Sequence, residues 1–311
     1  MSNRAFIKSS EQLTQEFAGQ RPLRAGSLIT TVFGDVVAPR GGVVWLGSLI
    51  NTLDGFGMNQ RLIRTSVFRL AKDGWLVSQP VGRKSYYGLT DVGRRRFETA
   101  AKRIYSPLVD DWDNQWTLVV IDGLPAETRD VLRKEMSWLG FGALSSGLMG
   151  HPDPDTQGLV DLLKELEVED HVMVMRAEKF ETTSSESMRR WVRHSWRLED
   201  LEARYGEFLD RFRPVYKASR TASTIDPEAA FRIRVLLIHE YRKIHLRDPL
   251  LPITLLPSDW AGQRAYQLCR NLYAAVYPAA ETYVGEQFET ADGPLPNLSK
   301  YFFRRFGGLK K

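Results

Sequence analysis

The first quarter of the chain carries three stripes of apolar residues at helical spacing. The stripes lie in 27–36, 46–53 and 59–72, and a short apolar strand at 43–45 separates the first two. Apolar residues at i, i+3, i+4 and i+7 form one face of a helix, and a Ser or Asn in front of such a stripe favours an N-cap. Ser27 and Asn59 stand at those places. The pattern predicts three short helices, with one strand between the first and the second.

A hairpin and a further helix follow. Two short runs rich in aromatic and apolar residues, 75–78 and 85–87, flank the polar tip 82–84, which is typical of a β-hairpin. Thr90 then precedes a helical pattern over 91–104. Helix, strand, helix, turn, helix and hairpin is the order of a winged helix-turn-helix. We predict this domain over residues 27–106.

Residues 1–26 have little apolar periodicity. They are mostly polar, with Pro22 and Gly26 near their end and only a weak stripe around Leu13 and Phe17. We expect them to form a flexible arm.

The middle of the chain changes to a mixed pattern. Strand-like runs at 116–121, 142–149 and 171–176 alternate with amphipathic helices at 126–139 and 156–166. This order favours a ferredoxin-like α/β sandwich, in which two helices cover one face of an antiparallel sheet. We predict such a domain over 114–180.

The remainder is mostly helical. Helical patterns cover 188–212, 227–244 and 259–277, and a proline-rich connection over 248–257 separates the last two. We assign 187–311 to a helical effector and dimerisation region. The fold class expected for the whole chain is α+β and multidomain.

Composition narrows the class of protein. A chain of 311 residues with 43% hydrophobic content can bury more than one core. No window approaches the roughly 18 uninterrupted apolar residues that span a bilayer, and no signal segment is visible. The only cysteine, Cys269, has no partner for an internal disulfide. We expect a cytoplasmic protein without a membrane partner.

Charge separates the first two predicted domains. Residues 58–105 hold eleven basic residues against three acidic ones, whereas residues 116–177 hold five basic residues against eleven acidic ones. A basic module followed by an acidic one indicates that only the first contacts a polyanion. Double-stranded DNA is the expected partner.

The third predicted helix divides into an apolar face and a polar face. DNA recognition requires this division, because one face anchors in a core while the other offers guanidinium and amide groups to base edges and phosphates. The candidate DNA-binding residues are Gln60, Arg61, Arg64, Thr65, Arg69 and Lys72 on this helix, with Arg83 and Lys84 on the hairpin. We expect base contacts from the first half of the helix. The alternative is an ordinary solvated basic face.

Signals for catalysis are absent from the sequence. We find no Walker A loop, no G-x-G-x-x-G after a strand, no G-x-S-x-G elbow and no HExxH. His239 and His245 lack the spacing of a zinc-binding helix. We therefore predict no catalytic residue, no metal site and no cofactor, and we expect a protein that is not an enzyme.

Three separated segments resemble one known family. They are RGGVVWLGSL from Arg40, RTSVFRLAKDGWL from Arg64 and GRKSYYGLTDVG from Gly82, and the similarity continues from Ser27 through most of the chain. In these segments the sequence is similar to the PaaX family of repressors of phenylacetate degradation. The resemblance implies a dimeric, GntR-like winged-helix repressor that leaves its operator when phenylacetyl-coenzyme A (phenylacetyl-CoA) binds.

The sequence also offers candidate residues for such an effector. Between Phe231 and Trp260, apolar and aromatic side chains are interleaved with basic ones. An acyl-CoA requires a hydrophobic slot for its acyl group and cations for its phosphates. The candidate effector-binding residues are Arg232, Arg234, Tyr241, Arg242 and Trp260. The alternative is an amphipathic core helix that binds no ligand.

Two other function classes stay open at this point. A metal-dependent nuclease built on the ferredoxin-like domain would use a strand-end carboxylate such as Asp122 to hold Mg²⁺. A winged-helix module that contacts proteins would show no salt-dependent DNA binding.

Overall fold

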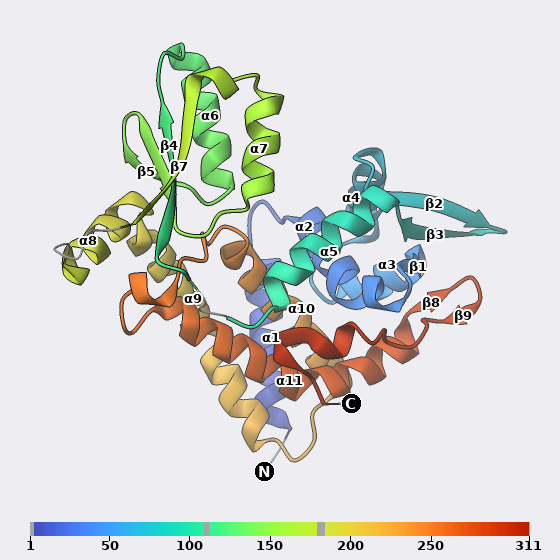
Figure 1. Ribbon diagram of the computed structural model, residues 1–311. Coiled ribbons are helices and arrows are strands. Elements are labelled where there is room, and N and C mark those ends of the chain that lie inside the picture. Colours follow the sequence, from blue (N-terminus) through green and yellow to red (C-terminus); the bar gives the residue numbers. More distant parts are fainter. Residues whose placement is uncertain (1–2, 109–111, 179–183, 311) are drawn as a thin grey trace. The chain divides into compact units, whose positions relative to one another are not determined.

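The computed structural model describes residues 3–108, 112–178 and 184–310, apart from the side chain of Ser185, and the chain forms two compact units (Figure 1). The first unit consists of Met1–Pro107, Glu207–Leu246 and Arg264–Lys311. The second consists of Leu108–Gly206 and Arg247–Gln263. Within the described ranges, no helix combines the length and the apolar character that crossing a membrane requires.

The first unit begins with a docked helix. Helix α1 (Arg4–Ala18) buries Phe6, Leu13 and Phe17 and packs along α10 (Pro227–His245). The flexible arm expected for residues 1–26 is therefore wrong for this segment. The buried face also includes Ser10 and Thr14, and these two polar residues obscured the apolar stripe. Ser10 stays satisfied because its hydroxyl donates to the Ala229 carbonyl at 3.3 Å.

The next elements are short helices around one strand. Their bounds are α2 (Ala25–Val32), the π-helix η1 (Phe33–Val37), the 3₁₀ helix η2 (Ala38–Arg40), β1 (Val43–Trp45), α3 (Leu46–Asp54) and α4 (Gln60–Lys72). Asn59 caps α4 as predicted, because its side-chain oxygen accepts from the Leu62 amide at 2.9 Å. The predicted Ser27 cap is wrong, because α2 already begins at Ala25. The π-helix carries Asp35 into the interior, where it is 1% exposed.

A three-stranded antiparallel sheet completes this region. β2 (Leu76–Val81) and β3 (Lys84–Leu89) form a hairpin, and β1 pairs with the other side of β3. Gly82 stands at the first central position of the two-residue turn with φ +59°, where glycine avoids the strain of a left-handed backbone. The hairpin extends away from the helices of its unit (Figure 1). Helix α5 (Asp91–Tyr105) follows, and the Thr90 hydroxyl caps it at 2.9 Å.

The C-terminal helices complete the same core. The elements are α9 (Leu198–Thr221), α10, α11 (Ala261–Gln287), β8 (Glu289–Thr290), β9 (Gly293–Pro294) and the 3₁₀ segment η5 (Phe302–Gly307). Thirteen of the nineteen residues of α10 are buried, and a helix that is apolar on all sides must be surrounded by other elements. Its neighbours include α1 and α2. The region 187–311 is therefore not a separate helical domain, because its parts divide between the two units.

The second unit is built on a four-stranded antiparallel sheet with strand order β5-β6-β4-β7. Its elements are β4 (Gln115–Ile121), α6 (Ala126–Trp138), β5 (Gly142–Ser145), β6 (Leu148–His151), α7 (Thr156–Glu165), η3 (Glu169–His171), β7 (Val172–Glu178), α8 (Ser185–Ser195) and η4 (Ile253–Leu255). Val119 of the sheet shares a core with Leu132 of α6 and Leu159 of α7. Helices α6 and α7 lie side by side next to the sheet (Figure 1). This is the ferredoxin-like arrangement that the pattern predicts. The strand expected over 142–149 is instead a hairpin that turns at Ser146 and Gly147.

Candidate nucleic-acid interface and buried polar cluster

Helix α4 presents a polar face that the sheet and α3 leave uncovered. Ile63, Ser66 and Val67 are buried on its inner side. The eight predicted DNA-binding residues are all exposed: Gln60, Arg61, Arg64, Thr65, Arg69, Lys72, Arg83 and Lys84. Six of them share the outer face of α4, and the other two lie at the hairpin turn.

The basic side chains of α4 are not neutralised by the protein. Among the residues that the structure describes, no carboxylate lies within ion-pair distance of Arg61, Arg64, Arg69 or Lys72. The Gln60 amide oxygen, suitably oriented, accepts from the Arg64 guanidinium at 2.8 Å. This contact orients Arg64 without removing its charge. Uncompensated cations on one helix face attract phosphate.

Phe68 is a member of this face that sequence reasoning missed. Its side chain is 65% exposed, although it is a large apolar residue on a helix with a well-packed inner side. The signal was present in the spacing, because Phe68 follows Arg64 by four residues and Thr65 by three. An exposed aromatic ring among cations can contact a thymine methyl group in a major groove.

Lys84 differs from the other cations because it already has an anionic partner. Its ammonium lies 2.5 Å from a Glu289 carboxylate oxygen and 4.2 Å from the centre of the Trp45 ring. The hydrogen bond with Glu289 raises the pKa of Lys84. The Lys84–Glu289 pair therefore joins the hairpin to the C-terminal strand β8.

Replacing Glu289 by glutamine is expected to strengthen DNA binding several-fold on any sequence. The change releases Lys84 to contact phosphate and removes a negative charge beside the hairpin, so the dependence of log K on log salt should steepen by about one. Fluorescence anisotropy across a salt series measures both quantities. Glu286→Gln is the matched control, because it removes the same charge from an exposed site on α11. Equal behaviour of the two variants would mean that Lys84 does not meet DNA.

The five predicted effector-binding residues are divided between the two units. Trp260 belongs to the second unit, where it packs against Tyr205 with ring centres 6.1 Å apart. The other four lie on α10 in the first unit. Arg232 pairs with Glu228 one turn away. Tyr241 is fully buried, with its hydroxyl 3.1 Å from Nδ1 of His245.

The two remaining members, Arg234 and Arg242, tie α10 to α2 and η1. The Arg242 guanidinium donates to the Thr31 hydroxyl at 2.8 Å and to the Ser27 carbonyl at 2.7 Å. Arg234 is fully buried and donates through Nε to the Asp35 carboxylate at 2.6 Å. Both guanidinium groups therefore have hydrogen-bond partners within the protein.

Asp35 is the centre of a buried polar cluster. Its carboxylate accepts from Arg234, from Arg305 of η5 at 2.7 Å, and from the hydroxyls of Tyr105 at 2.6 Å and Tyr273 at 2.9 Å. Burial by itself raises the pKa of Asp35, but the two guanidinium groups and the two hydroxyls outweigh it, so the pKa falls below its usual value. Asp35 is therefore ionised at neutral pH and connects η1, α5, α10, α11 and η5.

The cluster continues outward through Glu281. This carboxylate accepts from Arg234 at 2.5 Å and from Arg40. Burial and the nearby Arg234 lower the pKa of Arg40 to about 10, which leaves it charged at neutral pH. Three guanidinium groups thus share two carboxylates. The cluster, consisting of Asp35, Arg234, Arg305, Glu281 and Arg40, has a net positive charge.

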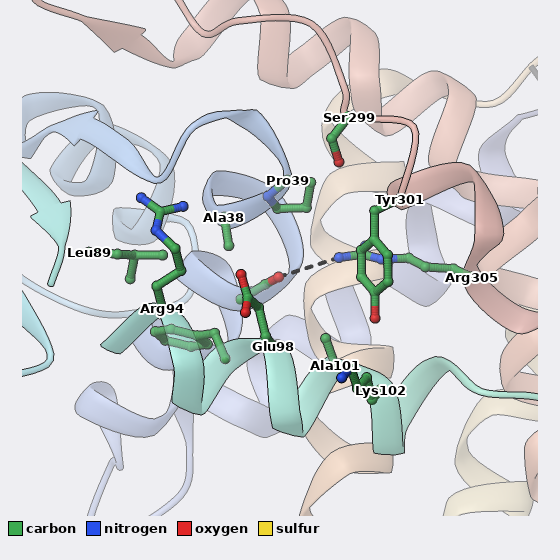
Figure 2. Close-up of a pocket in the computed structure, with 12 residues that line it drawn as sticks. Ala38, Pro39, Leu89, Arg94, Glu98, Ala101, Lys102, Ser299, Tyr301 and Arg305 are labelled. Atoms are coloured by element: carbon green, nitrogen blue, oxygen red, sulfur yellow. Dashed lines mark hydrogen bonds between the residues drawn. The ribbon is translucent and has the colours of Figure 1, made fainter. Parts of the chain in front are cut away.

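A cavity of about 340 Å³ lies beside this cluster, between α5, η1 and η2, and the C-terminal segment (Figure 2). We call it the α5 cavity. Its lining residues are Gly34, Ala38, Pro39, Leu89, Arg94, Phe97, Glu98, Ala101, Lys102, Ser299, Tyr301 and Arg305. Leu89, Phe97 and Arg305 are buried, whereas the residues at its opening are exposed. Sequence reasoning missed this cavity because its walls come from three distant parts of the chain.

Asp122, the carboxylate of the nuclease alternative, is exposed at the end of β4. Its Oδ1 accepts from the Gly123 amide at 2.9 Å. Within 3–108, 112–178 and 184–310, no three His, Cys, Asp or Glu side chains converge in a way that could hold a metal ion.

Comparison with known proteins covers most of the chain. Residues 24–93 match the family described as PaaX-like protein, residues 109–189 match the PaaX protein central Cas2-like domain, and residues 196–286 match the PaaX-like protein C-terminal domain. The central match agrees with the ferredoxin-like sheet of the second unit.

One curated relative is the transcriptional repressor PaaX of Escherichia coli (strain K12). It is 42% identical over 289 residues, which are 93% of this chain and 92% of that protein. The chain also matches a solved structure, that of the uncharacterized protein Rv0674 from Mycobacterium tuberculosis. The identity is 20% and the TM-score is 0.48, and the match covers 76% of this chain and 89% of that chain. The family matches and the relative together show that this chain belongs to the PaaX-like protein family.

Proposed function

We propose that the protein is a DNA-binding transcriptional repressor of aromatic, specifically phenylacetate, catabolism. The observation that carries the proposal is the face of α4, where exposed cations without carboxylate partners stand on a helix anchored in a core. A repressor among the relatives, at 42% identity over 93% of the chain, supports the same conclusion.

The N-terminal elements suit a winged helix-turn-helix. Helix α3 ends at Asp54, a short turn leads to α4, and the β2–β3 hairpin follows as the wing. In this arrangement α4 enters the major groove, with Arg61, Arg64 and Thr65 near base edges and Arg69 and Lys72 near phosphates. Arg83 at the tip of the wing reaches the adjacent backbone or groove.

Regulation requires a second copy and an effector. A homodimer places its two α4 helices in major grooves one turn apart, about 34 Å. An aryl-acyl-CoA such as phenylacetyl-CoA then favours a conformation in which that spacing no longer matches. By linkage, the effector weakens DNA binding only as far as it prefers that conformation. All of this takes place in the cytoplasm.

Fluorescence anisotropy on DNA from the gene's own upstream region tests the proposal. The DNA complex is titrated separately with phenylacetyl-CoA, free phenylacetate and acetyl-CoA. Release by the aryl thioester alone is the expected result. Tight binding that none of the three compounds changes would retain the DNA-binding claim and reject the effector. Binding without sequence preference would reject the repressor.

A further inference from the structure

The α5 cavity has the size and lining of a small-molecule site. Ligand pockets in proteins usually hold about 300–1,000 Å³, and this one holds about 340 Å³. Its inner walls are apolar and include Ala38, Leu89, Phe97 and Ala101. An apolar cavity of about 150 Å³ already accepts benzene. The α5 cavity therefore has room for an aromatic ring and a short polar extension.

Arg305 connects the buried polar cluster to the cavity, because it belongs to the cluster and also lines the cavity. Arg305 is 3% exposed, and its Nη atoms donate to Asp35, Tyr273 and the Gly34 carbonyl. Its Nε has no hydrogen-bond partner among the described residues. The net positive charge of the cluster favours a ligand atom with negative character on this side of the cavity. A carbonyl or carboxylate oxygen of a ligand meets this condition.

The opening of the cavity carries mixed charge. Arg94 and Lys102 of α5 are exposed there, together with the carboxylate of Glu98 and the half-exposed ring of Tyr301 (Figure 2). Two cations against one anion favour a ligand whose outer part is negative. The inner walls accept an apolar group, and the opening accepts an anionic one.

From these observations we infer that the α5 cavity binds an aromatic ring next to a carbonyl oxygen, the ring against Phe97 and Ala101 and the oxygen toward the side that Arg305 lines. The inference rests on the proposed function, because it assigns a binding site to the effector of the repressor. A thioester and a free carboxylate share this chemistry, and the experiment below distinguishes them.

Phe97 connects the cavity to the DNA-binding elements. Its ring meets the Trp75 ring edge to face, with centres 5.6 Å apart, and Trp75 lies between the end of α4 and the start of β2. A second cavity of about 110 Å³ is also lined by Phe97, together with Trp75. If a ligand in the α5 cavity displaces the Phe97 ring, the second cavity offers space for that ring. The movement would reach α4 and the wing through Trp75.

Filling the cavity tests the inference. Ala101→Leu and Ala38→Leu introduce the same side chain from opposite walls, and Thr99→Leu places it on an exposed position of α5 as the control. Isothermal titration calorimetry without DNA measures the binding of phenylacetyl-CoA, phenylacetate and acetyl-CoA. Anisotropy measures operator binding by each variant. Thermal unfolding confirms that each variant is folded.

We expect the wild type and Thr99→Leu to bind phenylacetyl-CoA. Both cavity-filling variants should bind phenylacetyl-CoA at least tenfold more weakly. They should still bind the operator, but phenylacetyl-CoA should no longer release them from it. Binding of phenylacetate would show that the carboxylate suffices, and its absence would show that the thioester is required. Unchanged affinity in the filled variants, or no binding of either aryl compound by the wild type, would overturn the inference. Loss of operator preference with intact, cavity-dependent ligand binding would instead overturn the proposed function alone.

Discussion

Replacing Asp35 by asparagine lowers the free energy of unfolding by about 3–5 kcal/mol, the usual cost of removing one partner from a buried ion pair. The variant leaves Arg234 and Arg305 charged in the interior, with only Glu281 to balance Arg234. Chemical denaturation measures the loss. Asp54→Asn, an exposed change of the same kind on α3, should leave the stability within about 0.5 kcal/mol of the wild type.

The contribution of Asp35 has a defined pH dependence. Because the folded pKa is lowered, the stabilisation is present above the unfolded pKa of about 3.9 and disappears as the pH falls through the folded value. The difference in stability between wild type and Asp35→Asn should therefore stay constant at neutral pH and shrink below about pH 4. A difference that is already small at pH 7 would mean that the cluster does not depend on the Asp35 charge.

A double-mutant cycle measures the coupling free energy between Asp35 and Arg305. Arg305→Met removes one buried cation, and its cost adds to that of Asp35→Asn only if the two groups act independently. We expect the double variant to be less destabilised than the sum, because the second change removes a charge that the first one orphaned.

Replacing Arg64 by alanine should weaken operator binding by about 1–3 kcal/mol, which is roughly 5-fold to 150-fold in the dissociation constant. Arg64 is exposed near the start of α4, and Gln60 holds its guanidinium without neutralising it. A guanidinium that contacts a guanine edge loses discrimination when it is removed, so binding to random DNA should change less than binding to the operator. Anisotropy on both duplexes measures the two effects.

Arg69→Ala provides the comparison for Arg64→Ala. Arg69 lies in the second half of α4, where we expect a phosphate contact. Its removal should weaken binding to the operator and to random DNA by the same factor. It should also reduce the slope of log K against log salt by about one. If Arg64→Ala behaves in the same way, Arg64 contacts phosphate and the base contact lies elsewhere on this face.

Local chemistry made several elements predictable. The caps at Asn59 and Thr90 form as expected, because each side chain bonds an amide only three residues away. The turn at Gly82 is equally local. The exposed polar face of α4 followed from its own 3.6-residue period. By contrast, α1 was missed because Ser10 and Thr14 are buried against α10, a contact that no local pattern encodes.

The sequence by itself determined the order of helices and strands over residues 43–105, the basic face of α4 and the ferredoxin-like pattern of the second unit, because periods, caps and charge act over a few residues. Only the tertiary structure decided the function of Asp35, whose partners Arg234 and Arg305 lie 199 and 270 residues away. It also decided that α10 is a core helix and that residues of η1, α5 and η5 line one cavity. Burial, ion pairing and cavities depend on which distant segments are in contact. The spacing of residues along the chain does not specify those tertiary contacts.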